Sequence, residues 1–198
     1  MPKTTEQYNE IRLEKKQLIM NVALELFAEH GFKSTSISQI AEAAGISKGL
    51  MYNYFCSKED LLKAVIINLV DEICNMIDPN HDKIISEEEA LQFFDKYFDM
   101  LQSRTNEFKL LLQICTQQEA YSFINKNMLL RRMVEYFGMF TVFFKKRNTK
   151  NPKMMMMNFN SIIRGFTTQY IFSPNLFTKK LLTEYKNYLK ETFILNTR

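Results

Sequence analysis

Residues 31–61 read GFKSTSISQIAEAAGISKGLMYNYFCSKEDL, and this stretch predicts two short helices joined by a tight turn. Ser36 is placed to cap the first helix, and Gly45 can adopt the left-handed conformation that ends it. Ser47 can then cap the second helix, which we expect over residues 48–55. The apolar stripe of the first helix consists of Ile37, Ile40, Ala41 and Ala44. This arrangement is that of a helix-turn-helix.

The rest of the chain also has the pattern of helices, with few residues that would break them. The sequence has only 5 Gly and 4 Pro, whereas sheet proteins need turn residues every few positions. Apolar residues recur at helical steps at about residues 6–30, 58–77, 86–104, 106–117, 124–146, 151–173 and 177–195. We therefore predict an all-α protein of about nine helices. A three-helix domain with the helix-turn-helix would occupy residues 1–58, and a second helical domain residues 59–198.

Composition argues against several classes of protein. No apolar run approaches the ~20 residues that span a bilayer, and the first residues lack the apolar core of a signal peptide. We therefore expect a cytoplasmic protein with no membrane partner. Three separated cysteines and two histidines predict no disulfide framework, metal site or cofactor. The sequence has no Gly-rich phosphate loop, HExxH or GxSxG motif, so we do not expect an enzyme.

Charge is unevenly distributed along the chain. The net charge of +4 is the sum of +1 over residues 1–58, −6 over residues 59–144 and +9 over residues 145–198. Charge alone would place nucleic acid at the C-terminus. We instead expect the basic C-terminal segment to form solvated helix faces that complement the acidic middle segment.

The order of residues 31–61, with Ala23, Leu26 and Phe27 before them, resembles the DNA-binding signature of the TetR family (TetR/AcrR-like) of transcriptional repressors. The resemblance covers about residues 17–65. It implies a regulator that holds a double-stranded DNA operator through the helix-turn-helix and releases it when a small-molecule inducer binds. The resemblance assigns DNA contacts to Thr35, Ser36, Ser47, Lys48, Gly49, Leu50, Tyr52, Tyr54 and Lys58.

Base reading would come from the start of the second helix, at Ser47, Lys48, Gly49 and Leu50. A lysine can donate to guanine, and an apolar side chain can contact the methyl group of thymine. Leu50 departs from the family, in which a small or polar residue is common here. Met51 takes the position of an inward leucine.

Phosphate contacts would come from the other five residues. Thr35 and Ser36 would direct hydroxyl or backbone N–H groups at a phosphate, and Tyr52, Tyr54 and Lys58 would reach the DNA backbone. Each of these side chains also has a structural interpretation, as a helix cap, a half-buried aromatic or a solvated charge.

The second half of the chain is rich in Phe, Met and Tyr at helical spacings, most of which we expect to form a core. Some of them would line a cavity for an apolar or amphipathic inducer. We name for this cavity Phe98, Phe108, Leu112, Met133, Phe137, Phe140 and Arg164. Arg164 interrupts an apolar helix, and long charged side chains are rarely buried unpaired. We expect it either to pair with a carboxylate or to bind an anionic ligand.

The last two helices have more apolar residues than one subunit would need to cover. In the family, these helices pair with those of a second copy, which implies a homodimer on a palindromic operator. The interface is predicted at Met155, Phe159, Ile162, Gly165 and Phe166. The alternative is a helical carrier of a lipid or small molecule, or an interaction protein, that does not bind DNA.

Overall fold

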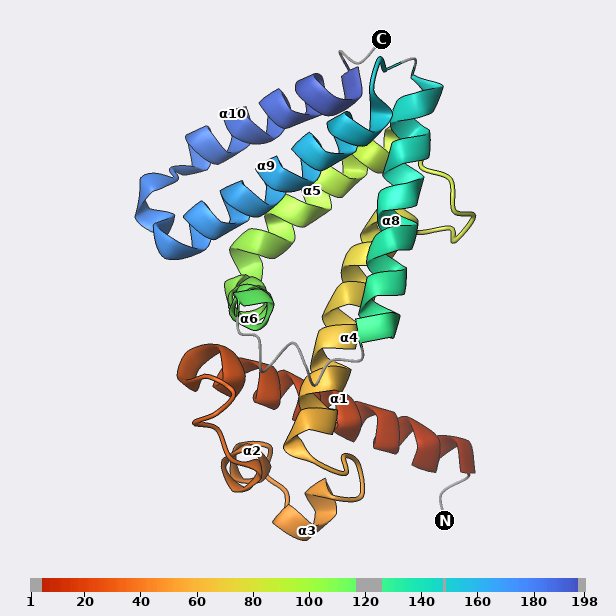
Figure 1. Cartoon of the computed structure of the whole chain (residues 1–198). Coiled ribbons are helices and arrows are strands. Elements are labelled where there is room, and N and C mark those ends of the chain that lie inside the picture. The colour runs from red at the N-terminus through yellow and green to blue at the C-terminus, as the bar shows by residue number, and fades with distance from the viewer. Residues whose placement is uncertain (1–4, 117–125, 148, 196–198) are drawn as a thin grey trace. The chain divides into compact units, whose positions relative to one another are not determined.

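The computed structural model describes residues 5–116, 126–147 and 149–195. These residues form nine α-helices and two short helical segments, and no strand occurs among them, which confirms the all-α prediction (Figure 1). None of the helices in this part of the chain combines the length and the apolar character needed to cross a membrane. The chain divides into two compact units. The N-terminal unit comprises Met1–Leu69 and Lys109–Asn125, and the C-terminal unit comprises Val70–Phe108 and Lys126–Arg198.

The N-terminal unit is built from α1 (Thr5–His30), α2 (Ile37–Ala43), α3 (Lys48–Met51) and the first part of α4 (Lys58–Ile77). Glycines separate the first three helices. Gly31 and Gly45 have φ angles of 83° and 64°, a conformation that side chains with a Cβ atom rarely adopt. The fully buried core residues of this unit include Ile19, Phe27, Ile40, Met51 and Leu61.

The second helix of the helix-turn-helix is shorter than predicted. It ends at Met51, and the expected continuation to Phe55 is a turn in which Tyr54 N donates to Met51 O at 3.0 Å. Phe55 then closes this turn as a buried residue, with its backbone N also donating to Met51 O at 3.1 Å. Phe55 is therefore buried at the end of a turn, whereas helical periodicity predicted that it would end the helix.

The C-terminal unit contains the rest of α4, α5 (Glu87–Ser103), α8 (Lys126–Lys146), α9 (Pro152–Phe172) and α10 (Lys179–Lys190). A short 3-10 helix, Pro174–Leu176, connects α9 to α10, and a π-helical turn, Glu191–Leu195, follows α10. The remaining helix, α6 (Thr105–Thr116), begins in this unit and continues into the N-terminal one, as α4 does in the opposite direction.

Aromatic rings form the centre of the C-terminal unit. The rings of Phe140 on α8 and Phe159 on α9 stack with their centroids 4.7 Å apart, and Phe94 on α5 meets Phe159 edge-on at 5.8 Å. Phe159 and Phe193 meet edge-on at 5.3 Å. These contacts join α5, α8, α9 and the C-terminal turn through one ring, so Phe159 occupies the middle of the core.

Two polar links also join α5 to its neighbours in this unit. The Tyr97 hydroxyl lies 2.5 Å from the Thr167 hydroxyl, and both residues are buried. At the surface, Lys186 and Lys190 of α10 lie 2.8 and 2.7 Å from the carboxylate of Asp95. Burial alone would raise the pKa of Asp95, but the hydrogen bonds from the two lysines lower it below its ordinary value.

Candidate functional site

The start of α2 is held by two hydroxyl groups that act differently. The Ser36 hydroxyl accepts from Gln39 N at 3.2 Å, and the Gln39 side chain accepts from Ser36 N at 2.7 Å, which forms a capping box. Thr35 is buried, and its hydroxyl donates to the carbonyl oxygens of Leu26 and Gly31. Because the Thr35 hydroxyl is directed into the protein, we do not propose that it contacts a phosphate.

The single turn of α3 presents three consecutive residues to solvent. The Ser47 hydroxyl caps the helix by accepting from Leu50 N at 3.1 Å. Lys48, Gly49 and Leu50 are exposed, with 38% of the Leu50 surface accessible, whereas the next residue, Met51, is fully buried. The predicted inward position of Met51 is therefore confirmed, and Leu50 lies on the outer face of the unit.

The two tyrosines after α3 are placed differently. Tyr52 is exposed over 48% of its surface, and Tyr54 is half-buried. Both phenol groups therefore remain partly accessible to a ligand. Their contact with DNA stays a prediction.

Lys58 lies at the start of α4 and bonds to the turn between α1 and α2. Its ammonium group donates to Phe32 O at 2.8 Å, Thr35 O at 2.9 Å and Lys33 O at 3.5 Å. It also lies 4.4 Å from the centre of the Phe32 ring. An ammonium has three N–H groups, and here all three directions are taken by carbonyl oxygens. We therefore do not propose Lys58 as a phosphate contact.

The C-terminal unit has a cavity of about 450 Å³ between the end of α4, the loop after it and α8. It is lined by Asp71, Cys74, Asn75, Ile77, Asp78, His81, Lys83, Arg132, Glu135, Tyr136 and Met139. The loop is held by Asp78, whose carboxylate accepts from the backbone N of Asp82 at 3.2 Å and of Lys83 at 3.1 Å. One wall of the cavity is therefore a loop fixed by side-chain contacts to its backbone. Hydrophobic periodicity predicts helices and could not predict this loop.

Charged pairs and two neutral groups give the cavity its chemistry. Lys83 lies 2.6 Å from Glu135, and Arg132 pairs with Asp71. Burial raises the pKa of the Cys74 thiol, and burial raises the pKa of Tyr136 well above its ordinary value. Both groups are therefore protonated at neutral pH and offer weakly polar or hydrogen-bonding surface beside the ion pairs.

None of the residues predicted to bind the inducer is among those that line this cavity. Phe98, Phe108 and Phe140 are buried core residues, and Leu112 and Phe137 are half-buried. The side chain of Met133 lies outside the described residues. The interpretation of Arg164 as a buried charge was wrong. It is exposed, because it is one residue, about 100° of helix, beyond the buried Ile163.

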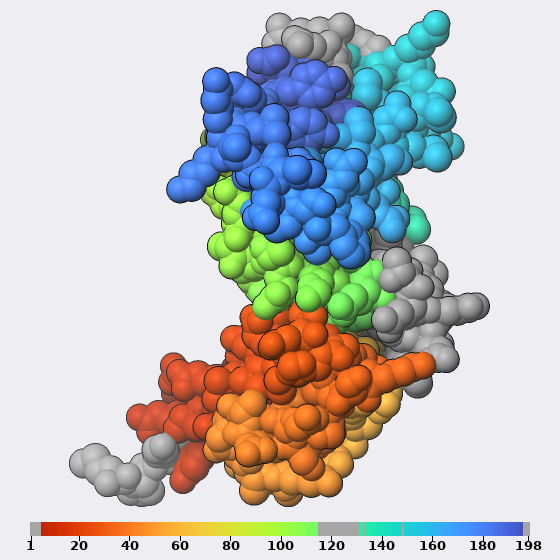
Figure 2. Space-filling view, turned by 90° about the vertical axis from the view of Figure 1, so that its left-hand side faces the viewer, coloured from red at the N-terminus to blue at the C-terminus, as the bar shows by residue number. Residues whose placement is uncertain are grey.

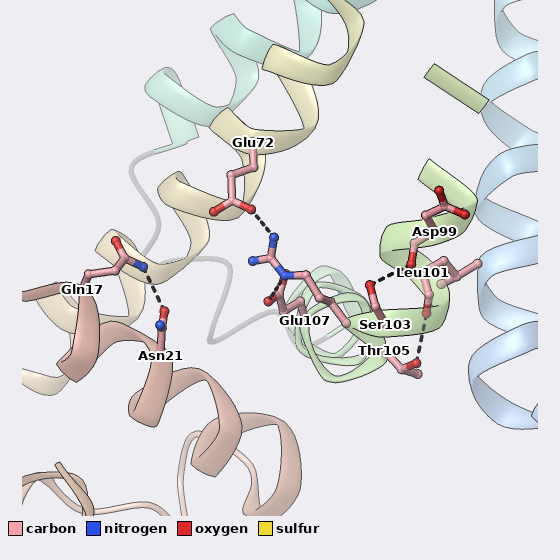
Figure 3. Close-up of polar contacts among 9 residues, drawn as sticks. Gln17, Asn21, Glu72, Asp99, Leu101, Ser103, Thr105 and Glu107 are labelled. Atoms are coloured by element: carbon pink, nitrogen blue, oxygen red, sulfur yellow. Dashed lines mark hydrogen bonds and ion pairs between the residues drawn. The ribbon is translucent and has the colours of Figure 1, made fainter. Parts of the chain in front are cut away.

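A second ionic cluster links α4 to the junction of α5 and α6 within the C-terminal unit. Glu72 and Glu107 both point toward the guanidinium of Arg104, which bonds to each of them (Figure 3). Burial opposes the charge of Arg104, but the hydrogen bonds to Glu72 and Glu107 outweigh it and raise its pKa. Beside this cluster, the hydroxyls of Ser103 and Thr105 donate to the carbonyl oxygens of Asp99 and Leu101. The end of α5 is therefore firmly held.

The outer face of α9 and α10 contains the predicted dimer residues only in part. Phe159 and Phe166 are buried in the core of their own unit, so Phe159, at 1% exposure, is not available to a partner. Met155 and Ile162 are half-buried, and Gly165 is exposed. Ile162, Gly165 and Phe166 line a shallow groove of about 310 Å³ together with Gln169, Phe177, Leu181 and Tyr185. Exposed apolar side chains of the same two helices are Met154, Met157, Phe172, Leu181 and Tyr188.

Comparison with known proteins identifies the N-terminal region. Residues 19–65 match the family model "Bacterial regulatory proteins, tetR family". The HTH-type transcriptional regulator RutR of Escherichia coli is 42% identical over 69 residues, which are 35% of this chain and 32% of RutR. The HTH-type transcriptional regulator YuxN of Bacillus subtilis is 51% identical over 53 residues, which are 27% of this chain and 18% of YuxN. The chain thus matches a third or less of the length of these relatives.

The whole fold is similar to that of solved regulators. The structure of the transcriptional regulator FadR from Bacillus subtilis in complex with stearoyl-CoA has a TM-score of 0.69 and 20% sequence identity. The match covers 90% of this chain and 97% of that one. Similarity over the C-terminal unit is therefore a similarity of fold, whereas similarity of sequence is concentrated around the helix-turn-helix.

Proposed function

This chain belongs to the TetR family of bacterial regulatory proteins, and we propose that it is a ligand-responsive repressor that binds a palindromic operator as a homodimer. Its relatives are transcriptional regulators rather than enzymes. The observation that carries the proposal is the outer face of α3. There Lys48, Gly49 and Leu50 are exposed, while Ser47 caps the helix and Met51 is buried. In a helix-turn-helix, the first residues of the second helix meet the base edges.

DNA binding is tested by measuring the affinity of the full-length chain for the promoter region of its own gene. Fluorescence anisotropy with this duplex, labelled, should show binding. An unlabelled random-sequence duplex of equal length should displace the chain from it only weakly. Equal affinity for both duplexes would contradict a sequence-specific repressor. No binding to either duplex would favour the alternative of a helical carrier.

The proposed homodimer uses the outer face of α9 and α10. Support comes from the apolar groove at Gly165 and from the exposed apolar side chains around it, which a monomer would leave in water. Within one subunit, a Cβ atom at Gly165 would meet nothing within 4 Å. Gly165→Leu should therefore leave each subunit folded but separate the two copies by steric overlap.

Sedimentation measures this effect directly. Gly138 on α8 is a matched control, because it also has open space around it and does not line the groove. We expect a monomer for Gly165→Leu and a dimer for both Gly138→Leu and the wild type. A monomeric wild type at micromolar concentration would rule the arrangement out.

The proposed inducer is an apolar or amphipathic small molecule that binds the cavity between α4 and α8. The cavity combines the Met139 side chain and the Tyr136 ring with the Lys83–Glu135 and Arg132–Asp71 ion pairs, a mixture suited to a molecule with an apolar and a polar end. The similar fold of FadR in complex with stearoyl-CoA makes a long-chain fatty acid and its CoA thioester reasonable first probes.

A thermal shift assay with these two probes tests the site. Arg132→Ala should reduce the stabilisation by the probe, whereas Arg131→Ala, an exposed neighbour that does not line the cavity, should not. Equal loss of binding in both variants would contradict the proposed site. The probe must also bind the DNA-free state more tightly, because a tenfold loss of operator affinity needs about 1.4 kcal/mol of differential binding.

A further inference from the structure

A second charged surface lies in the N-terminal unit, outside the helix-turn-helix itself. A groove of about 430 Å³ is lined by Asn9, Arg12, Leu13, Lys16 and Tyr54. The first four residues recur at steps of three and four, so they share one face of α1, and Tyr54 comes from the turn after α3. The groove therefore joins the N-terminal half of α1 to the segment that we propose to contact DNA.

The position of this face explains why it is open. In the second half of α1, the same face continues as Ile19, Ala23 and Phe27, all fully buried in the core. The first half projects beyond the other helices of the unit (Figure 1; red in Figure 2), and Arg12 and Lys16 there are exposed. One face of α1 is thus apolar in its buried second half and carries cations in its exposed first half.

The charges in the groove have one sign. Among the described residues, Arg12 and Lys16 form no ion pair with a carboxylate, and the groove contains no acidic side chain. Glu10 and Glu14 each follow a groove residue by one position. Their side chains are therefore about 100° further around α1 and lie away from the centre of the groove. Lys16 is held in place because its ammonium lies 5.6 Å from the centre of the Phe55 ring.

We propose that this groove binds the phosphodiester backbone of DNA, with Arg12 and Lys16 as cationic contacts and the Tyr54 phenol as a hydrogen-bond donor. The inference rests on the proposed function, which requires more cationic contacts with DNA than the helix-turn-helix itself provides. Residues 1–58 have a net charge of only +1, and the ammonium of Lys58 is directed at three carbonyl oxygens. Non-specific affinity for DNA comes almost entirely from cations at phosphates. Two exposed cations beside Tyr54 supply that contribution.

The salt dependence of binding to a labelled random-sequence duplex tests the proposal with the full-length chain. The double variant Arg12→Gln/Lys16→Gln should bind more weakly, and log affinity should fall less steeply with log salt, by about 0.9 for each phosphate contact removed. The control Lys15→Gln removes one charge from the same helix outside the groove, as Arg12→Gln alone does inside it, and should change the slope much less than Arg12→Gln.

Two further variants separate contact from folding. Arg12→Gln alone leaves the Lys16–Phe55 contact intact and should lower the slope without lowering the melting temperature. Arg12→Lys/Lys16→Arg keeps both charges and should keep the wild-type slope. An unchanged slope in the double Gln variant, or an equal decrease in Lys15→Gln, would overturn the inference while leaving DNA binding established. A wild type that binds no duplex would overturn the proposed function as well.

Discussion

The helix-turn-helix and the aromatic core differ in how far apart along the chain their contacting residues lie. Around α2 and α3, the Ser36 and Ser47 caps reach only three residues along the chain. In the C-terminal unit, the Tyr97–Thr167 and Asp95–Lys190 contacts join residues 70 and 95 positions apart. A segment whose caps are local depends less on distant residues for its geometry. A core shaped by distant contacts can alter its cavities through many different substitutions, which suits a sensor more than a DNA-reading element.

The largest difference between the two regions should appear when the centre of the aromatic core is emptied. Phe159→Ala removes a fully buried ring that contacts α5, α8 and the C-terminal turn. We expect a loss of about 3–5 kcal/mol in the free energy of unfolding, measured by denaturant titration. Val134→Ala, at an exposed site, should change it by less than about 0.5 kcal/mol. Similar losses in the two variants would contradict the central position of Phe159.

Alkaline pH should weaken the same core. Burial raises the pKa of Tyr97 to about 12 from 10.0, so the folded state keeps the phenol neutral where the unfolded chain ionises. Its contribution is complete below pH 10 and is lost as the pH rises toward 12, by about 1.4 kcal/mol per pH unit. Tyr97→Phe should flatten the decline in melting temperature over this range. If the melting temperature of Tyr97→Phe declines as steeply as that of the wild type, the decline must come from other groups, such as Tyr136.

A smaller effect is expected where one long-range contact supports the N-terminal unit. Lys58→Met removes the ammonium that faces Phe32 O, Lys33 O and Thr35 O. We expect a loss of about 1–3 kcal/mol in stability and an unchanged salt slope of DNA binding, because no phosphate contact is lost. Lys63→Met, one turn and a residue further along α4, is the control for charge. A slope lowered by about 1 with normal stability would instead identify Lys58 as a phosphate contact.

The smallest effect should come from a side chain that serves only recognition. Leu50→Ala should weaken operator binding by about 1 kcal/mol through loss of an apolar base contact, with little change in melting temperature because Leu50 is exposed. Met51→Ala, at the buried neighbouring position, should instead lower the melting temperature. A lowered melting temperature for Leu50→Ala with normal operator affinity would place Leu50 in the core.

The helices and caps could be predicted from the sequence because their signals are local. The Ser36 and Ser47 caps and the turn at Gly45 are all found in the structure. The outward Leu50 and inward Met51 followed from a resemblance over the same short stretch.

The cavity could not be predicted, because it depends on which helix faces leave space between them. A search for apolar stripes finds residues that fill the core, such as Phe98 and Phe140, rather than those beside a hollow. The polar residues at the end of α4 and on α8, including Asp71 and Arg132, were the better signal, since opposite charges on two helices can face each other. Arg164 misled for a related reason, because an apolar helix still has one face in water.

The length of α3 has a consequence for the evolution of operator choice. A helix of four residues cannot form by itself, because nucleating one turn in water is unfavourable. Its shape comes from the Ser47 cap and from Met51, which is buried against the unit. In the proposed repressor, substitutions at the outward positions 48–50 can therefore change which bases are read without disturbing the scaffold. Mutations that remove the Ser47 cap or the Met51 side chain, by contrast, would disturb the proposed recognition surface itself.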